Sequence, residues 1–97
     1  MIGHLFVFAT ITPKPEFFED AQAAIAGIVP DTRKEVGCFQ FVLHANTEEG
    51  CLYLYEEWQD QAALARHYTM PYVGAVFLKY QEWLAVPVDI KKFSKLL

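Results

Sequence analysis

The hydrophobic pattern changes its period several times along the 97 residues, and the order of these changes is the strongest restriction on the fold. Runs rich in β-branched and aromatic residues, typical of strands, cover residues 4–12, 38–45, 51–58 and 86–93. Apolar residues at helical spacing lie between the first two runs and between the last two. This β-α-β-β-α-β order predicts a single domain, residues 1–97, with a ferredoxin-like α+β fold. A four-stranded antiparallel sheet would carry the helices on one face.

The first helical segment is expected to be interrupted. It begins near Pro15, which suits a first helical turn, and it carries an apolar stripe over residues 17–29. Pro30 lacks the N–H group that a helix interior needs, so a kink or break is predicted there. A second helical piece over residues 32–36 would then end at Gly37, a typical C-terminal cap.

The second helical region and the last strand have clear boundaries in the sequence. Asp60 is a favourable N-cap, which predicts a short helix over residues 61–68. Pro71 predicts the start of another helix that runs to about Trp83. Because Pro87 cannot donate to a strand ladder, the last strand is expected at an edge of the sheet.

Both faces of the predicted sheet are apolar. The register is set by placing Ala45 opposite Cys51 across a turn at residues 46–50. One face then carries Phe39, Phe41, Leu43, Tyr53 and Tyr55, and the other carries Val42, His44, Leu52, Leu54, Glu56 and Trp58. Helices cover one face only, and a solvated antiparallel face normally alternates apolar and polar residues. We therefore predict a homodimer through the second sheet face rather than a bare apolar surface.

Composition and charge argue against several classes of partner. The net charge of −4 and the isoelectric point near 5.2 argue against nucleic-acid binding, which needs clustered Lys and Arg. No apolar run reaches the roughly 18 residues of a membrane span, and no signal peptide is expected. Cys38 and Cys51 lie at opposite ends of the predicted hairpin, too far apart for a disulfide. We therefore predict buried thiols and a cytoplasmic location.

The sequence contains no motif for a metal or a bound cofactor. His4, His44 and His67 are scattered and do not show the H-x-x-x-H spacing of a metal site. The five glycines are isolated, so no glycine-rich loop of the kind that cradles phosphates is present. We therefore predict neither a metal nor a cofactor.

Two stretches of the chain resemble a known family. Residues 55–72 read Y-E-x-W-x-D-x-x-A-L-x-x-H-x-x-x-P-Y, and residues 32–41 read T-R-x-E-x-G-C-x-x-F. Both are similar to stretches of the antibiotic biosynthesis monooxygenase (ABM) family. The resemblance implies a dimeric α+β barrel with an aromatic-lined pocket between sheet and helices. It also implies a cofactor-independent monooxygenase that acts on a small aromatic phenol or quinol.

Two other functions stay open on the same scaffold: a proton-transfer isomerase, and a non-catalytic small-molecule-binding dimeric module. Haem degradation, also found in the family, is not expected. Haem-degrading relatives use an Asn on the first strand and a His on the second helical region. Here residues 8–9 are Phe and Ala, and residues 73–80 contain no His. In addition, Pro71-Tyr72 stands where relatives often have Pro-His.

The candidate catalytic residues are His67 and Glu56. His67 is the candidate base, because an unperturbed imidazole titrates near neutrality, and simple packing on the core is the alternative. Glu56 lies between apolar strand neighbours, where burial would raise its pKa and make it a second acid or base. Pairing with Arg33 or Arg66 is the alternative for Glu56, since buried charges are usually paired.

The candidate substrate-binding residues are aromatic. Tyr55 and Tyr72 could each hydrogen-bond a phenol or quinone oxygen. Trp58 could stack on an aromatic substrate, and Phe41 is expected in the aromatic lining of the pocket. For the two tyrosines and Trp58, packing in the core is the alternative role.

Overall fold

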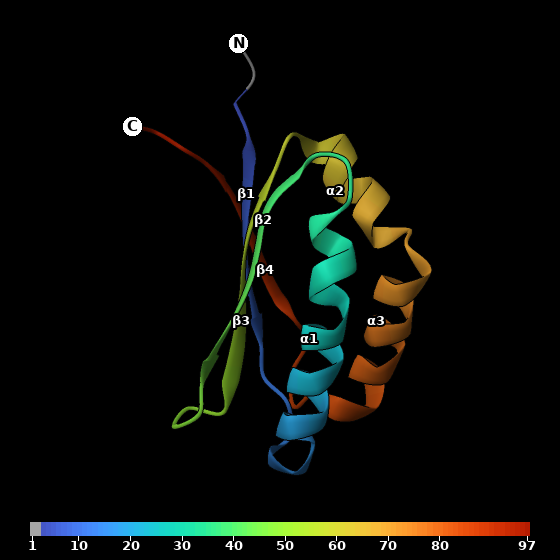
Figure 1. Ribbon diagram of the computed structural model, residues 1–97. Helices are drawn as coiled ribbons and strands as arrows, with labels where there is room; N and C mark the ends of the chain where they lie inside the picture. The colour runs from blue at the N-terminus through green and yellow to red at the C-terminus, as the bar shows by residue number, and fades with distance from the viewer. Residues whose placement is uncertain (1–2) are drawn as a thin grey trace.

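The computed structural model describes residues 3–97, which form a sheet with helices on one of its faces (Figure 1). The strands are β1 (Leu5–Ile11), β2 (Cys38–Asn46), β3 (Cys51–Trp58) and β4 (Asp89–Ser94). The helices are the short 3₁₀ helix η1 (Pro15–Phe17), α1 (Phe18–Arg33), α2 (Gln61–Tyr68) and α3 (Pro71–Trp83). The strand order is β2-β3-β1-β4, and every neighbouring pair is antiparallel. The predicted ferredoxin-like α+β fold is confirmed.

The boundaries of α2 and α3 agree with those predicted from their caps. The Asp60 carboxylate accepts a hydrogen bond from the Ala63 amide at 2.9 Å, which satisfies a free N–H at the start of α2. Pro71 is the first residue of α3, where its missing N–H costs nothing. Strand β4 lies at the sheet edge as predicted, although it begins at Asp89 rather than at residue 86.

Helix α1 is continuous through Pro30, so the predicted break and the separate helix over residues 32–36 are wrong. Pro30 removes one helical hydrogen bond, to the carbonyl of Ala26, but both residues are exposed, so solvent can reach that carbonyl. On the other side of the helix, Ile25 and Thr32 are fully buried and hold it against the sheet. Packing therefore carries the helix to Arg33.

The hairpin register differs by one residue from the predicted one. Ala45 pairs with Leu52 rather than with Cys51, because the connection is a four-residue turn closed by Asn46 and Cys51. At this turn, the Asn46 side chain accepts a hydrogen bond from the Glu49 amide at 3.1 Å. Gly50 has a positive φ of 70°, which favours glycine.

Because of this shift, the residues of β2 beyond Gln40 lie on the opposite face from the predicted one, relative to β3. Phe41 and Leu43 lie opposite Glu56 and Leu54, on the face that the helices cover. Val42 and His44 lie opposite the tyrosines of β3 on the other face. A β-bulge between Cys38 and Gln40 restores the predicted register at the far end, where Cys38 pairs with Trp58.

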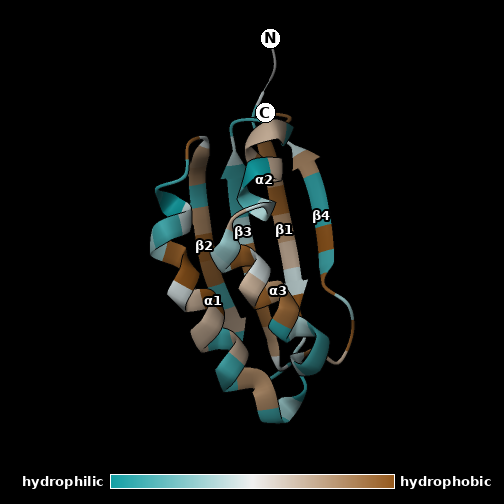
Figure 2. Cartoon of the chain, turned by 90° about the vertical axis from the view of Figure 1, so that its right-hand side faces the viewer, coloured by the Kyte–Doolittle hydropathy of each residue, from teal (hydrophilic) through white to brown (hydrophobic). Residues whose placement is uncertain are grey.

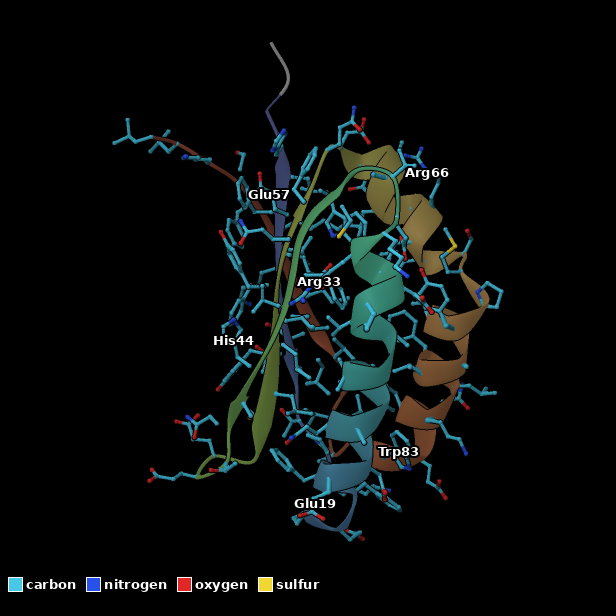
Figure 3. The ribbon with its side chains drawn as sticks, viewed as in Figure 1. Glu19, Arg33, His44, Glu57, Arg66 and Trp83 are labelled. Carbon is cyan, nitrogen blue, oxygen red and sulfur yellow. The ribbon has the colours of Figure 1, made fainter. Side chains whose placement is uncertain are left out.

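The two faces of the sheet have different surroundings. The helix-covered face holds the core, whose fully buried side chains include Val7, Ile11, Ile25, Leu52, Trp58 and Leu64. Figure 2 shows α1 in front of β2, whereas no helix lies in front of β4 at the edge of the sheet. The opposite face, called here the open face, carries the aromatic side chains Phe6, Phe8, Tyr53, Tyr55 and Phe93. Figure 3 shows His44 and Glu57 on this side, turned away from the helices.

Within residues 3–97, Cys38 and Cys51 are free thiols at opposite ends of the hairpin, and both are half-buried rather than fully buried. A cytoplasmic location stays a prediction. In the same residues, no helix combines the length and the apolar character that crossing a bilayer would require.

Candidate functional site

A small, mostly apolar cavity lies between the sheet and the helices. Its volume is about 30 Å³, which holds about two water molecules. The four strands, with Val88 just before β4, form one wall, and the three α-helices form the other. The lining residues are Ala9, Ile11, Ile25, Ile28, Phe41, Leu54, Glu56, His67, Tyr68, Val73, Val76, Phe77, Tyr80, Val88 and Ile90. The polar groups in this lining are His67, Glu56 and two tyrosine hydroxyls.

His67 lies in the last turn of α2, on the helix face that packs inward. Ala63, Leu64 and His67 are the buried residues of α2, and His67 is only 4% exposed. The imidazole Nδ1 lies 3.0 and 3.2 Å from the two carboxylate oxygens of Glu35. The ring packs against Trp58 at a centroid distance of 4.8 Å and against Phe41 at 5.5 Å. The ring is therefore held on several sides.

Glu56 lies on β3 between two core side chains, and it is buried as predicted. The Trp58 indole N–H donates to its Oε1 at 2.8 Å. Burial raises the pKa of Glu56 from its usual 4.5 to about 7, although the hydrogen bond from Trp58 opposes this rise. A carboxyl with this pKa can both give and take a proton near neutral pH.

The predicted arginine partner of Glu56 is wrong. Arg33 Nε donates instead to the backbone carbonyl of Phe41 at 3.0 Å. Arg66 is exposed on the outer side of α2, as Figure 3 shows. No ion pair to Glu56 is found in residues 3–97. Without a cation beside it, the buried carboxyl keeps a raised pKa.

The stability of the fold is expected to fall as the pH rises through neutrality, because of Glu56. Between pH values of about 4.5 and 7, its raised pKa makes the folded chain bind more protons than the unfolded chain. The free energy of unfolding therefore drops across this window, by about 3 kcal/mol. Glu56→Gln removes the titration and keeps an oxygen for Trp58. Urea unfolding at several pH values should show a flatter profile for this variant, and identical profiles would contradict the assignment.

The structure brings together only some of the predicted site residues. His67, Glu56 and Phe41 line the cavity. Trp58 is fully buried behind them, where it holds Glu56 and packs on His67. Tyr55 lies on the open face of the sheet, paired with Val42 and Phe8, so it does not reach the cavity.

Tyr72 lies outside the lining and makes a different contact. Its hydroxyl donates to the Glu35 carboxylate, the same group that holds His67. The buried environment and the charge of Glu35 both raise the pKa of Tyr72, so its hydroxyl stays protonated.

The sequence interpretation missed three residues of the site. Glu35 lies within the motif stretch of residues 32–41, but no local signal links it to His67. Tyr68 and Tyr80 lie on α2 and α3 and contribute hydroxyl-bearing rings to the lining. Burial raises the pKa of Tyr68 to about 12, with a further contribution from the charge of Glu56. Tyr80 is one of the apolar residues at helical spacing between Pro71 and Trp83, and this pattern was a signal that its side chain is buried.

An open groove adjoins the cavity at the connection between α3 and β4. It has a volume of about 500 Å³ and shares Phe77, Tyr80 and Val88 with the smaller cavity. Gln81 and residues 84–87 complete its lining. Phe77 is 37% exposed, so this side chain lies between the smaller cavity and the solvent. No group of three His, Cys, Asp or Glu side chains placed to hold a metal occurs in residues 3–97.

Comparisons with known proteins agree with this architecture. The family model described as "Antibiotic biosynthesis monooxygenase" matches residues 4–78. The solved structure of PA3566 from Pseudomonas aeruginosa is 30% identical, with a TM-score of 0.92 over 100% of this chain and 98% of that chain. Rv0793 from Mycobacterium tuberculosis, provisionally named a monooxygenase, is 26% identical over 99% of this chain and 95% of its own length. Its solved structure gives a TM-score of 0.91 over 97% of this chain and 96% of that chain.

A longer relative is the uncharacterized protein sll1783 from Synechocystis. It is 30% identical over 91 residues, which cover 93% of this chain but 62% of that protein. The chain thus spans less than two thirds of the length of that relative. The family match extends over most of the chain and includes both motif stretches and every cavity-lining residue up to Phe77. The chain belongs to the antibiotic biosynthesis monooxygenase family.

Proposed function

We propose that this chain is a cofactor-independent monooxygenase acting on a small aromatic phenol or quinol. The observation that carries the proposal is the cavity between sheet and helices, in which His67 and Glu56 face an otherwise apolar and aromatic lining. The family description and the name of Rv0793 support a monooxygenase in general. The aromatic rings in the lining support an aromatic substrate.

The proposed reaction needs a base, an apolar space and a fixed orientation. The substrate O–H gives its proton to His67, and the electron pair of the broken bond stays on the phenolate oxygen. The phenolate passes one electron to O₂, and the resulting phenoxyl radical and superoxide recombine through a C–O bond. The peroxide anion formed in this way takes the proton back from His67 and becomes a hydroperoxide. Loss of water, made from the carbon-bound hydrogen and the outer OH group, then leaves a quinone, with one oxygen atom in the product and one in water. Glu56 is the second group able to move a proton in this space.

Entry of the substrate requires movement of the lining. Ligand pockets commonly measure about 300 to 1,000 Å³, whereas this cavity measures about 30 Å³. Phe77 and Val88 separate it from the larger groove outside. We infer that the substrate enters from this groove when these side chains move aside.

Oxygen uptake tests the proposal. A thermal-shift screen of phenols and quinols selects compounds that bind, and an oxygen electrode then follows each of them with and without the protein. Uptake that requires both protein and phenol, together with a quinone product, is the expected result. Conversion of a bound compound without oxygen uptake would favour the isomerase, since His67 can also shift a proton. Binding without any conversion would favour the small-molecule-binding module.

We propose further that the protein works as a homodimer formed through the open face. Phe8, Tyr53, Tyr55 and Phe93 give this face an aromatic surface, where a solvated face would carry polar residues. A second copy of the same sheet, related by a two-fold axis, would cover these rings with matching apolar groups.

Phe8→Lys is expected to raise the dissociation constant of this dimer by about 100-fold, because it buries a charge without a partner on each side of the two-fold axis. Sedimentation equilibrium measures the constant directly. Gln22→Lys adds the same charge on the exposed side of α1 and should leave it unchanged. A wild-type protein that is monomeric at micromolar concentration would contradict the dimer.

A further inference from the structure

The buried carboxylate of Glu35 holds two side chains from two different helices. Its side chain is 5% exposed, and it lies in the turn between α1 and β2. The carboxylate accepts hydrogen bonds from His67 Nδ1 on α2 and from the Tyr72 hydroxyl on α3. Two side chains that lie 32 and 37 residues after Glu35 in the sequence therefore meet at this one charged group. Such a group is costly to bury unless its hydrogen bonds are satisfied.

The turn that carries Glu35 is itself rigid. The Glu35 amide donates to the Thr32 carbonyl at 3.0 Å, and the Cys38 amide donates to the Glu35 carbonyl at 3.1 Å. The Gly37 carbonyl accepts from the Gln59 amide at 2.7 Å, which ties the turn to the start of α2. The position of the carboxylate is thus fixed by the backbone on both sides.

The contact with Glu35 decides which nitrogen of His67 carries the proton. A carboxylate only accepts hydrogen bonds, so the nitrogen that faces it must be the N–H donor. A neutral imidazole has a single proton, and with that proton on Nδ1 the lone pair is on Nε2. No hydrogen bond of Nε2 to another group is found in residues 3–97. Since the ring lines the cavity, Nε2 is the nitrogen left for a bound molecule.

We propose that Glu35 is a positioning residue, which keeps His67 protonated on Nδ1 and leaves Nε2 as the basic atom toward the cavity. This inference rests on the proposed function in assigning the role of base to His67. When Nε2 takes the substrate proton, the N–H bond forms from its lone pair and the ring becomes a cation. The carboxylate beside Nδ1 then stabilises that cation. Tyr72 completes the arrangement by satisfying a second acceptor site on the carboxylate.

Nitrogen chemical shifts of the His67 ring in the full chain test the positioning directly, without any substrate. The expected wild-type spectrum shows a protonated Nδ1 and an unprotonated Nε2. Glu35→Gln offers a donor as well as an acceptor, so signals of the other tautomer should appear in this variant. Protonation of Nε2 in the wild type, or an unchanged tautomer in Glu35→Gln, would overturn the proposal. The wild-type spectrum decides even if the variant fails to fold.

A matched control exists on the open side of the sheet. His4 Nδ1 lies 2.5 Å from Glu57 Oε2, which is the same chemical pair in an exposed setting. Glu57→Gln should leave the ring signals of His67 unchanged. With the substrate found by oxygen uptake, Glu35→Gln should lower kcat by about 10- to 100-fold and change KM by less than about 2-fold.

The two proposals can fail separately. If Glu35→Gln keeps full activity while replacement of His67 abolishes turnover, the base assignment stands and the positioning role is wrong. If replacement of His67 leaves turnover intact, the base assignment is wrong. The ring spectra then still show whether Glu35 sets the tautomer.

Discussion

Replacing His67 with alanine is expected to lower kcat by about 100- to 10,000-fold, the usual contribution of a general base. The variant has no group at the cavity wall that can take the phenol proton in the same position. Glu56 remains and has a suitable pKa of about 7, but Trp58 holds it in place. Initial rates of oxygen uptake over a range of substrate concentrations would separate the effect on kcat from that on KM.

Two variants separate lost chemistry from lost structure. His67→Gln fills most of the ring volume and can still donate to Glu35, but an amide does not act as a base near neutral pH. We expect it to be as inactive as His67→Ala and more stable. Arg66→Ala removes an exposed side chain from the same helix and should keep full turnover. Full activity in His67→Ala would exclude His67 as the base.

Replacing Gly37 with alanine is expected to reduce the free energy of unfolding by about 2 to 5 kcal/mol. Gly37 has a φ of 86°, and this left-handed conformation costs a residue with a Cβ about 1 to 2 kcal/mol. The new Cβ would lie 2.7 Å from the Cβ of Ala63 on α2, which forces the turn and the helix apart. Overpacking of this kind adds about 1 to 3 kcal/mol. Urea unfolding followed by circular dichroism measures the loss.

Gly27 provides the matched control for this substitution. It lies in the interior of α1 and is exposed, and a methyl group on its Cα would meet no atom within 4 Å beyond its own helix backbone and chain neighbours. Gly27→Ala should therefore stabilise the protein by about 1 kcal/mol, through helix propensity alone. A Gly37→Ala protein as stable as the wild type would show that the turn can move away from α2 at no cost.

The sequence predicted those elements whose ends depend on local chemistry. Asp60 and Pro71 act through the backbone of their own helices, so the boundaries of α2 and α3 agreed with prediction. Pro30 failed as a helix breaker because burial of Ile25 and Thr32 outweighed a lost hydrogen bond on the exposed side. The hairpin register failed because the turn has one residue fewer than predicted, and nothing in the strand pattern reports that number.

The same distinction applies to the candidate site. His67, Glu56 and Phe41 were recognised from residue type and pattern, and all three line the cavity. Glu35 could not be assigned, since its partners are 32 and 37 residues away in the sequence. Tyr55 was placed in the site because of its motif. Because side chains alternate along β3, Tyr55 and Glu56 lie on opposite faces of the sheet. Tertiary packing decides which of these faces the helices cover.

Side chains along β3 alternate between the two faces of the sheet, so neighbouring residues have separate roles. Glu56 and Trp58 point toward the cavity side of the sheet, while Tyr55 and Glu57 point toward the open face. Substitutions at odd and even positions can therefore be selected independently, one set for chemistry and the other for surface contacts. A single inserted or deleted residue in this strand would exchange both sets at once. The strand should thus tolerate a change of residue type at one position better than a change of its length.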